Sequence, residues 1–124
     1  MNISEEFIKK AIRKYFPSST EQAQIDKVFL DMRNKSELLK LCKGNEIDIN
    51  RLQAAIIKLS KGKLSELKET VSGAYEDPLD IVLWAEEPNL YKASLERSKP
   101  PSGQEKEQFE EKDKKQYSEW LDSL

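Results

Sequence analysis

The chain has 124 residues, the usual length of one domain, with 21 basic and 23 acidic residues and a formal net charge of -2. This charge is too close to neutral to supply the uniform positive field of a dedicated nucleic-acid binder. Charged residues make up 35% of the chain and hydrophobic residues 37%, which favours helices with one buried stripe and a wide solvated face. Four Gly and five Pro are too few for the many tight turns of a sheet protein.

A single cysteine, Cys42, excludes an internal disulfide and a cysteine-based metal site. Such cysteine usage is typical of a reducing compartment. The N-terminal segment alternates apolar and charged residues, so we expect neither a signal peptide nor a membrane span. The sequence therefore predicts a cytoplasmic protein that does not associate with membranes.

The first two helices are predicted from their capping residues. Ser4 precedes two acidic residues, and its hydroxyl can accept hydrogen bonds from the free amides of a helix start. Apolar residues then recur at helical spacing until Pro17, which disfavours helical geometry in the residue before it. Ser19 with Gln22 three residues later has the form of a capping box, and it predicts a second helix that ends near Asn34.

The next two helices are predicted from glycine stops. Ser36 is the expected cap of a short third helix, and Gly44 is expected to end it in a left-handed conformation. Asp48 or Asn50 begins the fourth helix, which is the most apolar segment and ends at Gly62. The apolar stripe of the third helix is predicted to contain Leu38, Leu39, Leu41 and Cys42.

Two further helices and a short extension follow. A fifth helix is expected to end near residues 73–76. Asp77 before Pro78 is a strong start signal for a sixth helix, because proline at the first helical position gives up an amide that had no partner there. Pro88 interrupts this helix, and residues 90–97 are predicted to form only one or two more turns.

The amino-acid composition of the chain changes after residue 97. Residues 98–103 contain two prolines, two serines and a glycine, which predicts a short extended linker. Residues 104–124 are mostly charged, but their few apolar side chains lie near one helical face. We predict an all-α protein, with a compact bundle of five or six short helices in residues 1–97 and an amphipathic C-terminal helix in residues 104–124. That last helix is expected to be stable only if it docks.

The chain contains no histidine, which removes the commonest general base near neutral pH and the commonest transition-metal ligand. It also lacks a glycine-rich phosphate loop and the alternating acidic pattern of a calcium loop. We therefore expect no catalytic residues, no metal site and no cofactor, and an enzyme based on carboxylates or lysine is the second alternative. Cys42 could be a reactive thiol beside Lys40 and Lys43, but a buried core position is favoured.

Two aromatic segments are the predicted partner-binding sites, because Trp and Tyr supply a large contact area at little entropic cost. The competing interpretations are that Trp84 belongs to the core and that the terminal helix packs on its own domain. We predict a non-enzymatic protein-binding module of the adaptor or inhibitor (immunity) type, with self-association left open. Its predicted partner-binding residues are Trp84, Glu86, Glu87, Leu90, Tyr91, Tyr117, Trp120 and Leu121.

The main alternative is a nucleic-acid-associated protein that uses the basic face of the first helix. Tyr15 beside this face could stack on a base. The competing interpretation is that these residues form the solvated side of an ordinary helix. The predicted phosphate-contacting residues are Lys9, Lys10, Arg13 and Lys14.

The run from Arg51 to Gly62 reads R-L-Q-x-A-x-x-K-L-S-x-G, and residues 80–88 then read D-x-x-L-x-A-E-x-P. This pair of segments resembles a pattern found in small uncharacterised bacterial proteins. The pattern consists mainly of core positions and helix stops. The resemblance implies a bacterial, cytoplasmic setting and carries no activity or site residue with it.

Overall fold

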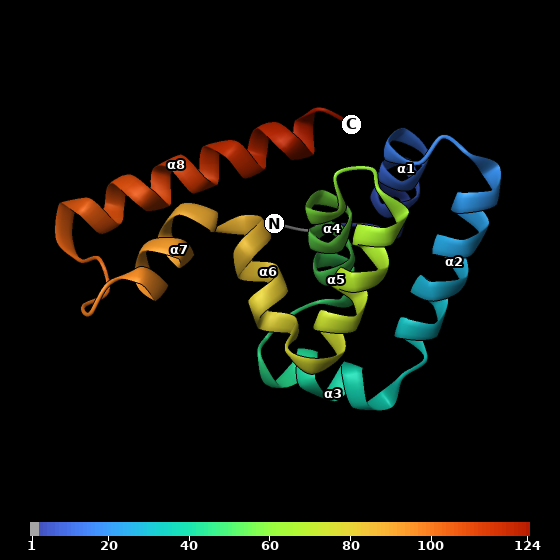
Figure 1. Cartoon of the computed structure of the whole chain (residues 1–124), viewed down its shortest axis with the longest axis horizontal. Coiled ribbons are helices and arrows are strands. Elements are labelled where there is room, and N and C mark those ends of the chain that lie inside the picture. The colour runs from blue at the N-terminus through green and yellow to red at the C-terminus, as the bar shows by residue number, and fades with distance from the viewer. Residues whose placement is uncertain (1–2) are drawn as a thin grey trace.

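The structure is a computed structural model that describes residues 3–124, and over this range the chain forms eight helices and no strand. None of the helices described is long and apolar enough to cross a membrane. In Figure 1, α2 and α3 lie at the edge of a helical body centred on α4 and α5. Helix α8 lies on the side of this body away from α2, next to α6 and α7. The helices in chain order are α1 (Glu5–Tyr15), α2 (Ser19–Arg33), α3 (Ser36–Gly44), α4 (Ile49–Ser60), α5 (Leu64–Glu76), α6 (Pro78–Glu86), α7 (Pro88–Glu96) and α8 (Gly103–Asp122).

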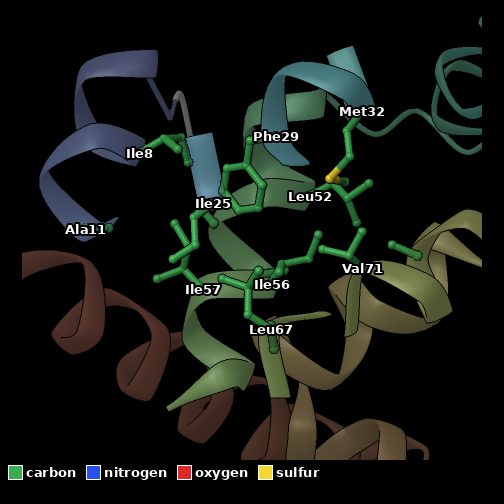
Figure 2. Close-up of a cluster of buried hydrophobic side chains, with 14 of the residues drawn as sticks. Ile8, Ala11, Ile25, Phe29, Met32, Leu52, Ile56, Ile57, Leu67 and Val71 are labelled. Atoms are coloured by element: carbon green, nitrogen blue, oxygen red, sulfur yellow. The ribbon is translucent and has the colours of Figure 1, made fainter. Parts of the chain in front are cut away.

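Helix α4 is the centre of the core, because its residues 52–57 are all buried. It packs against α1, α5 and α6. Figure 2 shows Leu52, Ile56 and Ile57 of α4 meeting side chains from α1, α2 and α5. The other labelled core residues in that view are Ile8, Ala11, Ile25, Phe29, Met32, Leu67 and Val71.

Several helix starts follow the predicted local signals. The side chains of Ser4, Asp48 and Asp77 each accept a backbone N–H in the first turn of the helix that follows. Pro78 is the first residue of α6, as expected. Helix α4 ends where Lys61 and Gly62 take left-handed φ values of 51° and 76°, so the predicted stop at Gly62 is confirmed.

Two predicted caps are wrong by one residue. Helix α2 is capped by Ser18, whose hydroxyl accepts the Glu21 N–H, and the side-chain amide of Gln22 donates to the Phe16 carbonyl instead of completing a capping box. Helix α3 starts after Lys35 with no side-chain cap, and Ser36 is already its first residue. Only two residues separate α2 from α3, so the chain has no room for a longer turn.

The predicted left-handed stop at Gly44 is also wrong. Gly44 belongs to α3, and the left-handed residue is Glu46, with φ 56°. This turn brings Ile47 into the core, where its backbone N–H donates to the Cys42 carbonyl at 2.8 Å. Of the four residues predicted for the α3 stripe, Leu38 and Cys42 are buried, whereas Leu39 and Leu41 are exposed.

The fold is all-helical, but the predicted count of five or six helices before the C-terminal one is too low. The segment predicted to form one or two turns is a complete helix, α7. Helix α8 begins at Gly103, one residue before the predicted start, and packs against α7 and α6. Its C-terminal end lies close to α1 in Figure 1.

Candidate functional site

A groove of about 360 Å³ lies between α1 and α2. We define the α1–α2 groove by its apolar residues, which are Ile8 and Ile12 from α1 and Phe29 and Leu30 from α2, and by the polar residues around them. Leu30 is 59% exposed although it is large and apolar. A single exposed leucine is ordinary on a protein surface, but Leu30 also lines a concave cleft. The polar lining residues are Glu5, Lys9, Arg13, Gln22, Asp26, Arg33 and Gln53.

The inner end of the groove is fixed by Gln53 of α4, which is fully buried. Its amide nitrogen donates to the Phe29 carbonyl at 3.0 Å, and its amide oxygen accepts from the Arg33 guanidinium at 2.9 Å. Arg33 also contacts Asn50 and donates to Glu5 at 3.3 Å. These bonds join α1, α2 and α4 beside the groove.

The groove divides the predicted basic residues. Lys9 and Arg13, four residues apart on α1, line it, and neither forms an ion pair with any residue from 3 to 124. Lys10 is exposed outside the lining. Lys14 contacts the Ser123 carbonyl of α8's end, and its ammonium group lies 5.5 Å from the centre of the Tyr15 ring. Lys9 and Arg13 therefore line the groove, whereas Lys10 and Lys14 lie outside its lining.

The predicted aromatic pair is brought together. The rings of Trp84 on α6 and Tyr91 on α7 meet edge to face, with centroids 5.0 Å apart. The Tyr91 hydroxyl donates to the Asp80 carboxylate, which raises the pKa of Tyr91 to about 12, with burial adding to the effect. Both rings are half-buried, so part of their surface is used inside the chain.

The predicted acidic residues lie at the joint between α6 and α7. Both carboxylate oxygens of Glu86 accept from the Arg51 guanidinium at 2.8 Å, a bidentate pair that raises the pKa of Arg51. Glu87 is the residue between the two helices and makes no side-chain cap bond. The Leu90 backbone N–H donates to Asp113 of α8 at 2.9 Å.

The joint is also held from outside by α4 and α8. The Lys58 ammonium donates to the Ala85 carbonyl at 2.9 Å, and burial lowers the pKa of this lysine. The side-chain amide of Gln116 donates to the carbonyls of Ala85 and Glu86, each at 3.3 Å. Residues distant in sequence therefore satisfy the carbonyls at the end of α6.

The aromatic residues of the C-terminal helix pack on the same chain. Tyr117 is 3% exposed and stacks on Trp120, with ring centroids 5.7 Å apart. Trp120 in turn lies 5.9 Å from the Phe7 ring and 6.2 Å from the Tyr15 ring of α1. Leu121 is half-buried. This stripe is therefore largely occupied by contacts within the chain.

Cys42 lies in the core with 2% of its surface exposed, and burial, with a smaller contribution from Asp48, raises the pKa of its thiol. Desolvation therefore dominates over any effect of the neighbouring lysines. Among residues 3–124, no group of three or more Cys, Asp or Glu side chains is placed to hold a metal ion.

Sequence reasoning missed the α2 side of the groove. The helical spacing of Ile25, Val28, Phe29 and Met32 predicts that these four residues form the buried stripe of the second helix, and it gives no role to Leu30. One signal was present, because Leu30 is a large apolar residue next to the predicted stripe of α2 and not within it. That position places an apolar side chain on what would otherwise be a solvated face.

Comparison of the chain with protein-family models, curated proteins and solved structures gives no match. The resemblance to small bacterial proteins stays a prediction.

Proposed function

We propose that this chain is a non-enzymatic protein-binding module of the adaptor or inhibitor type, and that the α1–α2 groove is its docking surface. The observation that carries the proposal is Leu30, a leucine with more than half of its surface exposed next to a concave, partly apolar cleft. Grooves between helices commonly receive the apolar face of a partner helix.

The spacing of the lining residues fits a helical occupant. Glu5, Lys9 and Arg13 recur every four residues along α1, and Asp26 and Leu30 do so along α2. From Glu5 to Arg13 the α1 edge measures about 12 Å, the length of about two helical turns. Leu30 offers most of the exposed apolar surface to a partner helix, because Ile8 and Ile12 are only 4% and 3% exposed.

The charges around the groove indicate the polarity of that partner. Glu5 is already paired with Arg33 at 3.3 Å, whereas Lys9 and Arg13 have no ion-pair partner within residues 3–124. Asp26 is the one acidic lining residue outside an ion pair in this range. We therefore infer an amphipathic partner helix with carboxylates beside its apolar face, positioned to pair with Lys9 and Arg13.

The same geometry gives weaker support to nucleic acid as the partner. Phosphate binding would favour a continuous basic surface, but Glu5 and Asp26 lie in the groove with Lys9 and Arg13, and Lys14 contacts the end of the chain. Binding to DNA or RNA is an outcome that the following experiment distinguishes.

The test is a pull-down from a native lysate with matched surface variants of the full chain. Leu30→Asp and the double variant Lys9→Glu/Arg13→Glu change the groove. The controls Leu95→Asp and Lys10→Glu/Lys40→Glu make the same changes of polarity and charge at exposed positions outside it. A partner captured by the wild type and by both controls, but lost with both groove variants, supports the proposal. We expect Leu30→Asp to weaken the purified complex at least about tenfold, as for the loss of an apolar anchor.

Two results would contradict the proposal. Equal capture by the wild type and Leu30→Asp would show that the partner binds elsewhere. Retention of nucleic acid that falls steeply as salt concentration rises, and that is lost with Lys9→Glu/Arg13→Glu, would instead favour phosphate contacts.

A further inference from the structure

A second cleft, of about 250 Å³, lies where the joint between α6 and α7 faces α8. It is separate from the α1–α2 groove and shares no lining residue with it. We call it the acidic cleft, because four of its six lining residues carry carboxylates. The lining residues are Glu86, Glu87, Glu110, Asp113, Lys114 and Tyr117.

The four carboxylates differ in what they already bind. Glu86 is held by Arg51, and Asp113 accepts from the first amides of α7. Glu110 has only a loose pair with Lys106 at 3.7 Å, in which both side chains are about half exposed, and such pairs contribute little. Glu87 has no hydrogen bond or ion pair to its side chain within residues 3–124.

The surroundings of Glu87 disfavour its negatively charged form, so they would favour a bound cation. Burial raises the pKa of this carboxyl, and the nearby charges of Glu86, Asp113 and Glu110 raise it further, against a smaller opposite effect from Arg51. A positive charge bound at this point would stabilise all the carboxylates at once.

Tyr117 provides an independent indication of a ligand. Its side chain lines the cleft and is 97% buried, yet its hydroxyl forms no hydrogen bond with any described residue. A buried hydroxyl without a hydrogen-bond partner is unfavourable, and a bound donor would remove that cost.

We propose that the acidic cleft binds a primary ammonium group. The three N–H donors of an ammonium group match the carboxylates of Glu87 and Glu110 and the hydroxyl oxygen of Tyr117. A divalent metal ion fits less well, because it needs more oxygen ligands than these and the other two carboxylates are engaged. The ammonium group could belong to a lysine side chain of a partner protein or to a free polyamine.

The experiment titrates the full chain at low salt with Nα-acetyl-lysine methylamide and, separately, with spermidine, followed by amide NMR. The uncharged control compound is Nα-acetyl-norleucine methylamide, which keeps the alkyl chain and lacks the ammonium group. We expect saturable shifts centred on Glu87, Glu110 and Tyr117 with both amines and none with the control. Tighter binding of spermidine would assign the site to polyamines, and equal or tighter binding of the lysine derivative to a partner's lysine.

Matched variants separate a specific site from general attraction of cations. The pair Glu87→Gln/Glu110→Gln removes two charges from the cleft, and Glu107→Gln/Glu111→Gln removes two charges from exposed positions of α8 outside it. We expect the cleft pair to weaken amine binding at least about tenfold, whereas the exposed pair leaves it within about twofold. Tyr117→Phe should weaken it about threefold or more, because the phenol oxygen is lost as an acceptor.

Circular dichroism of each variant confirms that it is folded. The cleft variants should fold, because Glu87 and the Tyr117 hydroxyl have no partner to lose within residues 3–124. The proposal is overturned if the exposed pair weakens amine binding as much as the cleft pair. Saturable shifts at the same residues with the norleucine control would overturn it as well.

Discussion

The Asp113 carboxylate of α8 caps the N-terminus of α7 by accepting the backbone N–H of Leu90 at 2.9 Å. Its other oxygen accepts the Asn89 backbone N–H at 3.0 Å and also contacts the Asn89 side-chain amide. Asp113 is 1% exposed, so its carboxylate needs these hydrogen bonds in place of water. The first amides of α7 in turn need the carboxylate as their acceptor. The C-terminal helix therefore takes part in forming α7 and does not merely lie on it.

Replacing this cap should loosen both helices. We expect Asp113→Ala to lower the free energy of unfolding by about 2–3 kcal/mol, because hydrogen bonds to a buried charged group are lost and two backbone amides are left unpaired. Hydrogen exchange should accelerate mainly in α7 and α8. The exposed Asp122→Ala is the control and should change stability by less than about 0.5 kcal/mol. Unchanged exchange in α7 would contradict this role.

Tyr117 and Tyr91 should respond differently to loss of the hydroxyl. Tyr117→Phe removes a group without a partner among the described residues, so stability should stay the same or rise. Tyr91→Phe removes the donor to Asp80 and should cost about 1 kcal/mol. Urea unfolding of the two variants measures both effects, and a large loss with Tyr117→Phe would show that its hydroxyl is bonded within the folded chain.

The pH dependence of stability should report on Glu87. Its pKa in the folded chain is raised above the ordinary value of 4.5, so in the window above pH 4.5 the folded state binds more protons than the unfolded chain. The contribution of Glu87 to the free energy of unfolding therefore increases as the pH falls through this window and decreases as the pH rises. The other charged residues around it are Glu86, Arg51, Glu110, Asp113 and Lys114.

We accordingly expect Glu87→Gln to be more stable than the wild type at pH 7, with the difference disappearing below pH 4.5. Urea titrations at several pH values measure this difference. The exposed Glu111→Gln should show no such trend. A variant that is less stable than the wild type at pH 7 would mean that Glu87 has a stabilising partner in solution.

Cys42 should behave as a core thiol. It is 2% exposed and its pKa is raised by burial, so thiol reagents at neutral pH should modify it only when the chain opens. The rate of modification should rise by orders of magnitude in denaturing urea. Rapid modification of the native chain would show that the α3 region opens easily.

The parts of the fold that the sequence predicted depend on short-range chemistry. Ser4, Asp48 and Asp77 each cap a helix whose first amides lie within three residues, so the signal and its effect are adjacent in the chain. Helix α7 was underestimated because its cap comes from Asp113, more than twenty residues later. No local pattern around residues 88–96 contains that information.

The candidate site was predicted only in part for a similar reason. Lys9 and Arg13 were recognised from their charge, but the apolar side of the groove arises because α1 and α2 both pack on the core around α4. The helical spacing predicts that Phe29 is buried, but it does not indicate which helix Phe29 packs against. The spacing of apolar residues predicts one apolar face on the C-terminal helix. Whether that face packs on its own chain or on a partner depends on tertiary packing, which the spacing does not indicate.

The most direct test of the proposed docking surface is amide NMR of the full chain with its purified partner. We expect the largest shifts on binding to fall on Ile8, Ile12, Phe29 and Leu30, and we expect Leu30→Asp to remove them while the chain stays folded. Shifts centred on Trp84 and Tyr91 with those four amides unchanged would contradict it.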